Sequence, residues 1–383
     1  MLWLWVVLTL VVTVRLGLVE QDPRRNNVYL KVFAAAGGAF RHGEDLYVAS
    51  DGSNFGFRYP PLAAVFFVPF AMCGAVLGSI LWRIVSLATV LLALRACFRA
   101  GFPMVMSSRE RGIVLLIVLL IGITSFNNGQ VNPLMLGLFL FATTGSLTGR
   151  SGSPAAAIAA CATFKVYPVV YGAVLGLLRP RQLLWLGLFL LAGAFLPFAL
   201  QNPDYVAGQY AKLWQTLQAE DRTQGDLRNV YRDLRLIAIS VGFTLSESLF
   251  QILQVLGGGA IAAGCLLLQR RGASARRVLE YAFSSTMCWL MLLGPATEKA
   301  TYVWIAPSLA WVLVAAWRQQ GRTWRVAAVL ANGLALASLY PFDLNAEDGG
   351  LWRWCLLPYA GLVLAVIFAL RAIGDLARLR RGA

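Results

Sequence analysis

The chain has 383 residues, of which 58% are hydrophobic and only 13% are charged, and its mean hydropathy is +0.67. Soluble domains carry about a quarter charged residues, so this composition excludes a soluble protein. The net charge of +15 comes from arginines and lysines that gather in short linkers. Such linkers are typical of the cytoplasmic side of a membrane protein, and they do not indicate a nucleic-acid partner.

Apolar segments long enough to cross a bilayer recur along the chain with short polar links between them. Because backbone groups in lipid must be hydrogen-bonded within their own segment, we predict an all-α polytopic protein with about twelve transmembrane helices. The predicted spans are 2–19, 60–74, 76–98, 112–126, 131–148, 154–178, 182–200, 248–268, 278–294, 300–317, 325–342 and 351–371. The short links leave room for a single transmembrane domain, 1–383, and the first span is expected to be retained rather than cleaved.

Two longer polar stretches, 20–59 and 201–235, are predicted to be extracytoplasmic loops. Twelve spans place both termini on one side, and the arginines near the C-terminus assign that side to the cytoplasm. Within the first loop, VYLKVFAAAGGAF has apolar residues at helical spacing, which predicts a short interfacial helix on the outer face. Together the two loops are expected to form a roof over a cavity at membrane level.

The acidic residues follow the same division. Of the 18 acids, all but Glu110, Glu280 and Asp375 fall in or beside the predicted extracytoplasmic loops. This distribution predicts that the outer face carries the polar function of the molecule.

One linker conflicts with this topology. Loop 99–111 contains three arginines, yet the span count places it outside. Either this loop breaks the rule, or residues 60–98 and 154–178 are not simple spans. Lys165 and Pro168 interrupt the second of these segments, which favours a helical hairpin or a broken helix there.

Charged residues at membrane depth are costly and are candidates for function. Arg58, in FRYPP, is either a snorkelling anchor beside Tyr59 or a cation for an anionic headgroup. Lys165, in FKVYP, must face a cavity or a partner, and we consider both phosphate binding and a structural ion pair. The amides of NNGQVN, residues 127–132, form either a plain turn or a set of hydrogen-bonding groups suited to sugar hydroxyls.

Three carboxylates lie at the predicted outer interface. Glu20 and Asp22 follow the first span directly, as a solvated loop start or as functional acids. Glu298, in GPATEKATY, is either paired with its neighbour Lys299 on the surface or lies at the rim of the cavity. His42 is the sole histidine and has no ligand spacing around it, so we predict neither a metal site nor a cofactor.

Five short motifs follow one another along the chain, and in this order the sequence resembles glycosyltransferase family 87. They are NNVY (26–29), GEDLY (43–47), FRYPP (57–61), GQVN (129–132) and KVYP (165–168). The family comprises polytopic GT-C enzymes related to polyprenyl-phosphomannose-dependent α-mannosyltransferases. The similarity covers about residues 26–181, and the second half matches in hydropathy and in GPATEKATY.

The resemblance implies a multi-pass hexosyltransferase of the plasma (inner) membrane with an extracytoplasmic active face. It would move a hexose, mannose by family default, from a polyprenyl-phosphate donor to a hydroxyl of a lipid or glycan acceptor, with inversion. A carboxylate must accept the proton of that hydroxyl. A cation must stabilise the departing phosphate. The implied partners are the lipid-linked donor, the acceptor and membrane lipids, without a nucleic acid.

The same resemblance suggests roles for individual residues. Lys165 and Arg58 are expected to bind the donor phosphate. The expected sugar or substrate contacts are Gln130, Asn128, Asn132 and Tyr59.

The catalytic base is where the sequence departs from the family. The family carries an Asp shortly before VY, whereas this chain has Asn26 and Asn27 there, and it also lacks the family's frequent histidine near 294–302. Asp22 is our preferred base and Glu298 the second choice, while a catalytically weak chain also fits the departure. The candidate catalytic carboxylates are Asp22, Glu20, Glu298 and Asp45.

Two other functions fit the sequence. A lipid-linked sugar transporter or flippase would use the same cations but need no carboxylate at the outer face. A non-catalytic scaffold in envelope synthesis would need neither the cations nor the carboxylate. Loss of transfer in an Asp22→Asn variant that still binds lipid would separate the enzyme from both.

Overall fold

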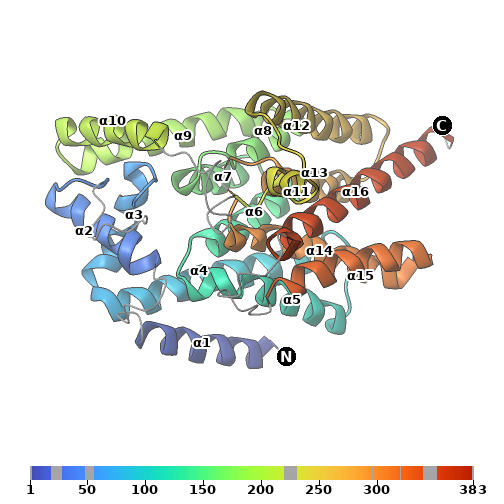
Figure 1. Cartoon of the computed structure of the whole chain (residues 1–383), viewed down its shortest axis with the longest axis horizontal. Coiled ribbons are helices and arrows are strands. Elements are labelled where there is room, and N and C mark those ends of the chain that lie inside the picture. Colours follow the sequence, from blue (N-terminus) through green and yellow to red (C-terminus); the bar gives the residue numbers. More distant parts are fainter. Residues whose placement is uncertain are drawn as a thin grey trace.

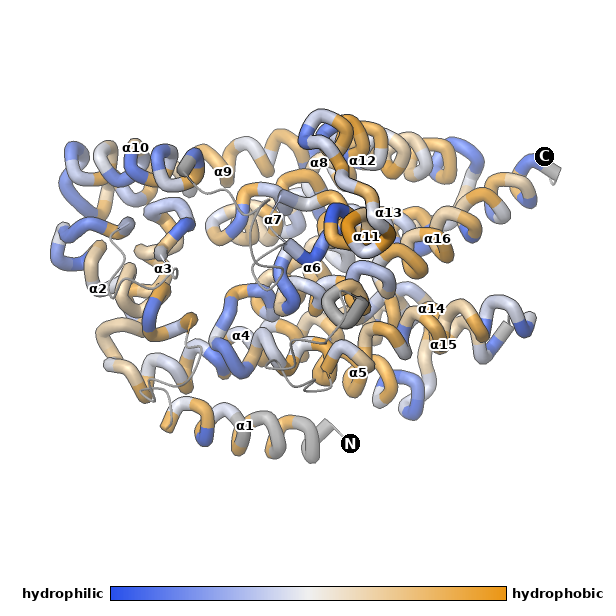
Figure 2. The backbone as a smooth tube through the Cα atoms, in the orientation of Figure 1, coloured by the Kyte–Doolittle hydropathy of each residue, from blue (hydrophilic) through white to orange (hydrophobic). Residues whose placement is uncertain are grey.

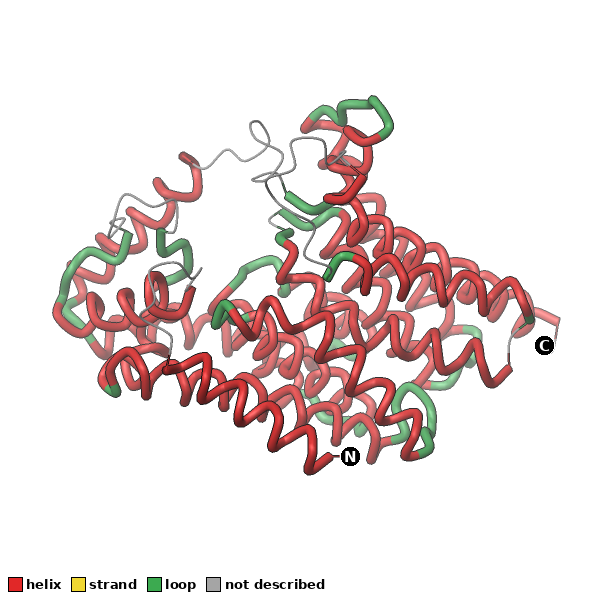
Figure 3. The backbone as a smooth tube through the Cα atoms, turned by 60° about the horizontal axis from the view of Figure 1, so that its bottom comes forward, coloured by secondary structure: helices red, strands yellow, loops and turns green. Residues whose placement is uncertain are grey.

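The structure is a computed structural model that describes residues 2–18, 28–47, 56–219, 231–295, 297–319, 321–339 and 352–381. Helices make up nearly all of this part of the chain, and it contains no strand (Figure 3). The elements are α1 (Leu2–Leu18), the π-helix η1 (Tyr29–Ala34), α2 (Ala35–His42), α3 (Pro61–Met72), α4 (Gly74–Ala100), α5 (Ser108–Asn127), α6 (Asn132–Leu147), α7 (Gly152–Phe164), α8 (Val169–Leu178), α9 (Arg181–Leu200), α10 (Pro203–Ala219), α11 (Leu234–Ser240), α12 (Glu247–Arg270), α13 (Ala275–Leu292), the 3-10 helix η2 (Lys299–Ile305), α14 (Ala306–Gln319), α15 (Arg322–Ala337) and α16 (Trp352–Arg381). The predicted all-α membrane fold is confirmed.

Six helical segments of the described chain are long and apolar enough to cross a membrane. They are Gly74–Ala100, Ser108–Asn127, Arg181–Leu200, Glu247–Arg270, Lys299–Arg318 and Cys355–Arg380. Figure 2 shows hydrophobic residues along these helices and hydrophilic residues mainly toward their ends. The other predicted apolar segments are also helical, but two of them are not single long helices.

The first of these, 60–74, contains α3, which has 12 residues. At 1.5 Å per residue it is about 18 Å long, too short for a hydrocarbon core of roughly 30 Å. The second, 154–178, is a helical hairpin made of α7 and α8. A Cβ atom on Gly172 would lie 2.8 Å from the Ile158 side chain, so the two legs pack closely. We call this pair the α7–α8 hairpin.

Both legs of the hairpin start and finish at the same end of the helix bundle. Gln182, just after α8, donates from Nε2 to the carbonyl of Arg150, just before α7, at 3.0 Å. Gln269 at the end of α12 donates to the Leu178 carbonyl at 3.5 Å. The linkers 148–151, 179–180 and 271–274 therefore lie together.

The arginine-rich loop 99–111 lies at this same end. Arg318, at the end of α14, donates to the Val105 carbonyl at 2.8 Å. A Cβ atom on Gly101 would lie 3.5 Å from the Arg276 guanidinium. We call this end, with linkers 101–107, 148–151, 179–180, 271–274 and Arg318, the basic end. Since α3 is short and the hairpin returns to its starting side, the conflict over loop 99–111 disappears.

The three acids that the sequence placed apart from the others all lie at the basic end, and each is paired with an arginine. Glu110 pairs with Arg318. Glu280 accepts hydrogen bonds from Arg277 at 2.7 Å and from Arg371 at 3.1 Å, and Arg277 also pairs with Asp375. These contacts fasten α5 to α14 and α13 to α16 (Figure 1).

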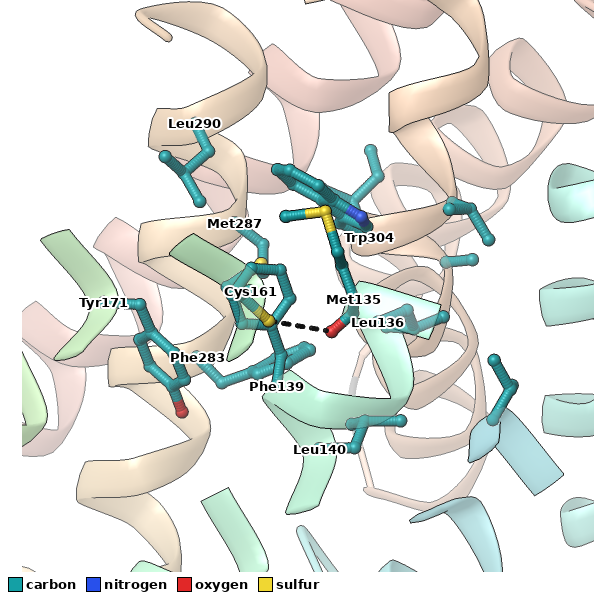
Figure 4. Packing of buried hydrophobic residues seen from close by; sticks show 14 of the residues in the cluster. Met135, Leu136, Phe139, Leu140, Cys161, Tyr171, Phe283, Met287, Leu290 and Trp304 are labelled. Atoms are coloured by element: carbon teal, nitrogen blue, oxygen red, sulfur yellow. Dashed lines mark hydrogen bonds between the residues drawn. The ribbon is translucent and has the colours of Figure 1, made fainter. Parts of the chain in front are cut away.

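The centre of the bundle is filled by aromatic and sulfur-containing side chains of α6, α13 and η2 (Figure 4). The Phe139 and Trp304 rings meet edge-on with centroids 5.2 Å apart. Cys161 of α7 lies 3.7 Å from the Met135 carbonyl, close enough for a weak hydrogen bond. This packing holds α7 against α6 and η2, and it carries the hairpin tip toward the opposite end of the bundle.

The helix predicted within the first loop is present as η1 and α2. Its apolar residues are buried against α3 and α4, and the Phe33 and Phe67 rings stack with centroids 4.5 Å apart. The Trp82 ring lies edge-on to Phe67 at 4.8 Å. These elements form an aromatic layer at the end opposite the basic end.

Candidate active site

The tip of the α7–α8 hairpin presents Lys165. Lys165 follows the last residue of α7 and has an extended backbone conformation. The next helix, α8, starts directly after Pro168. The side chain is half-buried, and its Nζ donates to Oγ1 of Thr301 at 3.4 Å. The Nζ atom also lies 5.4 Å from the Trp304 ring centroid and 5.8 Å from that of Tyr167. A lysine at membrane depth thus has polar and aromatic neighbours rather than lipid.

Glu298 meets Lys165 at the same threonine. Its carboxylate caps η2 by accepting the Thr301 amide, and its own amide donates to Oγ1 of Thr301 at 3.4 Å. Glu298 also interacts electrostatically with Lys165 and with Arg232. The structure thus brings Glu298 close to Lys165, which lies 133 positions earlier in the sequence.

The amide turn 127–132 lies beside this pair. Asn132 is buried, donates from Nδ2 to Oε1 of Gln130 at 2.6 Å, and accepts the Trp304 indole N–H on its carbonyl at 3.0 Å. Asn128 instead accepts the Val28 amide on its carbonyl at 3.1 Å. Gln130 and Asn132 therefore adjoin the tryptophan beneath Lys165.

The turn is held in place from α4. Trp82 donates to the Gly129 carbonyl at 2.8 Å, and Arg83 donates to the carbonyls of Phe126 at 3.1 Å and Asn127 at 3.0 Å. Gly129 has φ of 64°, and a Cβ atom there would lie 2.7 Å from the Cβ of Tyr29. Only glycine fits this turn without displacing the first-loop helix.

The predicted substrate residues at the start of α3 approach the hairpin tip from the other side. Tyr59 accepts the Tyr47 hydroxyl on its carbonyl at 2.9 Å, and its ring lies 5.3 Å from that of Phe33. Arg58, the residue before Tyr59, is half-buried.

Asp45 has a different environment. It pairs with Lys212 of α10, and the next residue, Leu46, donates its amide to Oε1 of Gln209 at 2.9 Å. Burial opposes ionisation of Asp45, but the hydrogen bonds from Lys212 and from the Tyr47 amide outweigh it, so its pKa lies below its usual range. A carboxylate of low pKa is a weak proton acceptor. Asp45 thus joins the first loop to α10, while Asp22 and Glu20 lie outside the described residues.

Several polar residues of the site were not predicted. Arg232 is buried, donates its amide to the Thr297 carbonyl at 2.7 Å, and accepts the Tyr302 hydroxyl on its own carbonyl at 2.7 Å. The end of the second polar loop, at Arg232, therefore lies directly against the segment that carries Glu298. Arg83 carried a usable signal, a lone charge within an apolar run, whereas Trp304 and Tyr167 resemble ordinary core aromatics in the sequence.

Cations, amides and a carboxylate thus meet at one end of a helical membrane bundle. The model of glycosyltransferase family 87 matches residues 57–295, which include FRYPP, GQVN and KVYP. The chain belongs to glycosyltransferase family 87, as its motifs predicted, and is a membrane glycosyltransferase.

Among solved structures, the chain is similar to ArnT from Cupriavidus metallidurans, crystallised with undecaprenyl phosphate bound. The two share 14% sequence identity and a TM-score of 0.48, over 95% of this chain and 77% of that one. No protein among the curated sequences matches the chain.

Proposed function

We propose that this protein transfers a hexose, mannose by family default, from a polyprenyl-phosphate carrier to a hydroxyl of a lipid or glycan acceptor. The main support is the contact of Lys165 and Glu298 with Thr301. It fixes a cation at the tip of an otherwise apolar hairpin. When the glycosidic phosphate departs, negative charge develops on its oxygens, and a preorganised cation in a site poor in water stabilises that charge.

The other residues near the hairpin tip have complementary roles in this proposal. Arg58 supplies a second cation to the phosphate. The amide groups of Gln130 and Asn132, with Tyr59, contact sugar hydroxyls, which neutral donors and acceptors suit well. The side-chain amide of Asn128, in the same turn, is a further proposed contact for the sugar.

Inversion at the anomeric carbon constrains the position of the base. The acceptor oxygen attacks opposite the leaving phosphate, so the base and the phosphate-binding cation lie on opposite sides of the sugar. Because Glu298 shares Thr301 with Lys165, it lies on the leaving-group side. We therefore propose Glu298 as a residue that positions Lys165, and retain Asp22, with Glu20 beside it, as the proposed base.

The face of the membrane follows from the basic end. Linkers rich in arginine remain in the cytoplasm, and Lys165 lies at the tip of a hairpin whose legs both begin at that end. We infer that the chain forms one transmembrane unit in the plasma membrane with its reaction centre toward the extracytoplasmic side.

The test is a transfer assay with the full chain in native-lipid nanodiscs. Radiolabelled polyprenyl-phosphate mannose, glucose and arabinose are supplied in parallel, with a total lipid extract as acceptor. We expect label in a new lipid from one donor. Asp22→Asn should abolish transfer and keep donor binding, while Lys165→Met should weaken donor binding as well.

Three results would contradict this proposal. Full transfer by Asp22→Asn would remove the proposed base. Unchanged donor binding by Lys165→Met would remove the proposed phosphate site. Binding of donor without transfer from any of the three would favour the transporter or scaffold instead.

A further inference from the structure

Tyr167 lies in the tip of the α7–α8 hairpin, two residues after Lys165. Its hydroxyl oxygen is buried and has no hydrogen-bond partner among the described residues. Buried tyrosine hydroxyls usually find a partner, and leaving one unsatisfied destabilises a protein. The Tyr167 hydroxyl is therefore available to form a hydrogen bond with a bound ligand.

Tyr171, one helical turn further along the same hairpin, provides a direct comparison. Tyr171 is fully buried, and its hydroxyl lies 2.6 Å from Oγ1 of Thr143. The hairpin thus holds two tyrosines with buried hydroxyl groups, of which one has a hydrogen-bond partner among the described residues. The exceptional one is at the tip, next to the lysine.

The surroundings of Tyr167 indicate which ligand would satisfy it. Its ring lies 5.9 Å from that of Trp304, and the Lys165 ammonium is 5.8 Å from its centroid. The carboxylate of Glu298 is close enough to interact electrostatically with it. A ligand that reaches Lys165 through its charge therefore also comes close to this hydroxyl.

We propose that the Tyr167 hydroxyl donates a hydrogen bond to a phosphate oxygen of the lipid-linked substrate, as a second substrate contact beside Lys165. The inference rests on the proposed function for the ligand class. A phosphate has several acceptor oxygens, so a lysine and a hydroxyl can bind it together. The hydroxyl adds a neutral donor at the hairpin tip, so the phosphate gains a hydrogen bond there without a further charge beside Lys165.

The experiment compares Tyr167→Phe with Tyr171→Phe in the full chain, using undecaprenyl monophosphate in nanodiscs as the probe. Tyr167→Phe should weaken binding about tenfold, the effect of one hydrogen bond to a charged group. Its melting temperature without lipid should equal that of the wild type or exceed it, because an unsatisfied hydroxyl is removed. Tyr171→Phe should show the reverse, with a lower melting temperature and unchanged binding.

Equal binding by Tyr167→Phe and the wild type would overturn this inference. So would a melting temperature that falls as far as in Tyr171→Phe, since the hydroxyl would then have a structural partner. The proposed function fails separately: if the wild type binds undecaprenyl phosphate but transfers no sugar, the enzyme assignment is wrong while the Tyr167 contact stands. If the wild type transfers sugar and Tyr167→Phe matches it in binding and rate, only the Tyr167 contact is wrong.

Discussion

Lys165 illustrates how a single charge at membrane depth gains neighbours from distant parts of the chain. Its hydrogen-bond partner, Thr301, is 136 positions away, and the tryptophan beneath it belongs to the same 3-10 helix. The sequence indicated Lys165 because a lysine in an apolar run must have a compensating environment. It did not indicate Thr301 or Trp304, because a threonine and a tryptophan in an apolar segment have no such cost.

The role of Glu298 can be tested by its substitutions. Glu298→Gln keeps an oxygen that accepts the Thr301 amide and removes only the negative charge. For a positioning residue we expect transfer to remain within about tenfold of the wild type, whereas Glu298→Ala, which loses the cap, should be impaired further. The measurement is kcat and KM for the donor in the nanodisc assay.

A general base would respond differently. An amide cannot accept the proton of the acceptor hydroxyl, so Glu298→Gln would then lose several orders of magnitude in kcat while KM stayed the same. That result would exchange the roles proposed for Glu298 and Asp22. Asp45→Asn, which alters a carboxylate paired with Lys212, is the matched control and should leave kcat unchanged.

At the scale of elements, the hairpin and α3 show what hydropathy can predict. Each predicted apolar segment is helical, and the break in 154–178 follows from Lys165 and Pro168. That residues 60–98 are not simple spans was one of the two alternatives raised by the arginines of loop 99–111. Hydropathy alone did not favour it, because the 12 residues of α3 are continuous in hydropathy with those of α4. Only the turn at Cys73 and Gly74, with φ of 76° at the glycine, separates the two helices.

Arg83 carries a prediction at this scale, since it joins α4 to the end of α5. Two carbonyls that α5 leaves unsatisfied accept its N–H groups, and Ser79 accepts a third. Arg83→Met should therefore destabilise the protein by about 1–3 kcal/mol, because Ser79 and the Asn127 carbonyl lose a charged donor, whereas the Phe126 carbonyl keeps the Gly129 amide. Thermal unfolding in detergent measures the change.

Arg95→Met is the control, because Arg95 is exposed on the same helix. We expect little change in its unfolding temperature. Similar losses for the two variants would show that charge on α4, rather than the contact with the 127–132 turn, supports the fold.

At the scale of the molecule, the basic end determines the topology. Loop 99–111 reaches the end of α14 through Arg318 and approaches Arg276, so its arginines lie beside those of the other short linkers. Hydropathy alone counted α3 and the hairpin as crossings and therefore separated this loop from the other basic linkers, which lie at the same end of the bundle. Contacts between distant linkers, which a single sequence does not reveal, correct the count.

This topology predicts the outcome of cysteine labelling in sealed vesicles. After replacement of the native cysteines, Arg109→Cys and Arg322→Cys should react with a membrane-impermeant maleimide from the same side. Asp204→Cys, at the start of α10, should react from the opposite side. Labelling of positions 109 and 322 from opposite sides would refute the position of loop 99–111.

The hairpin also affects how the protein enters a membrane during synthesis. Because both legs leave from the basic end, the segment between Arg150 and Arg179 can insert as a folded pair without translocating either flanking arginine. Lys165 is then the charged residue of this segment that must enter the membrane. Inserting a lysine costs about 3 kcal/mol at the middle of a lone helix and less near an interface. Two short apolar legs offset that cost jointly. At 1.5 Å per residue, the 13 residues of α7 carry the cation about 20 Å into the bilayer, while the hydrophilic flanks of the hairpin never cross.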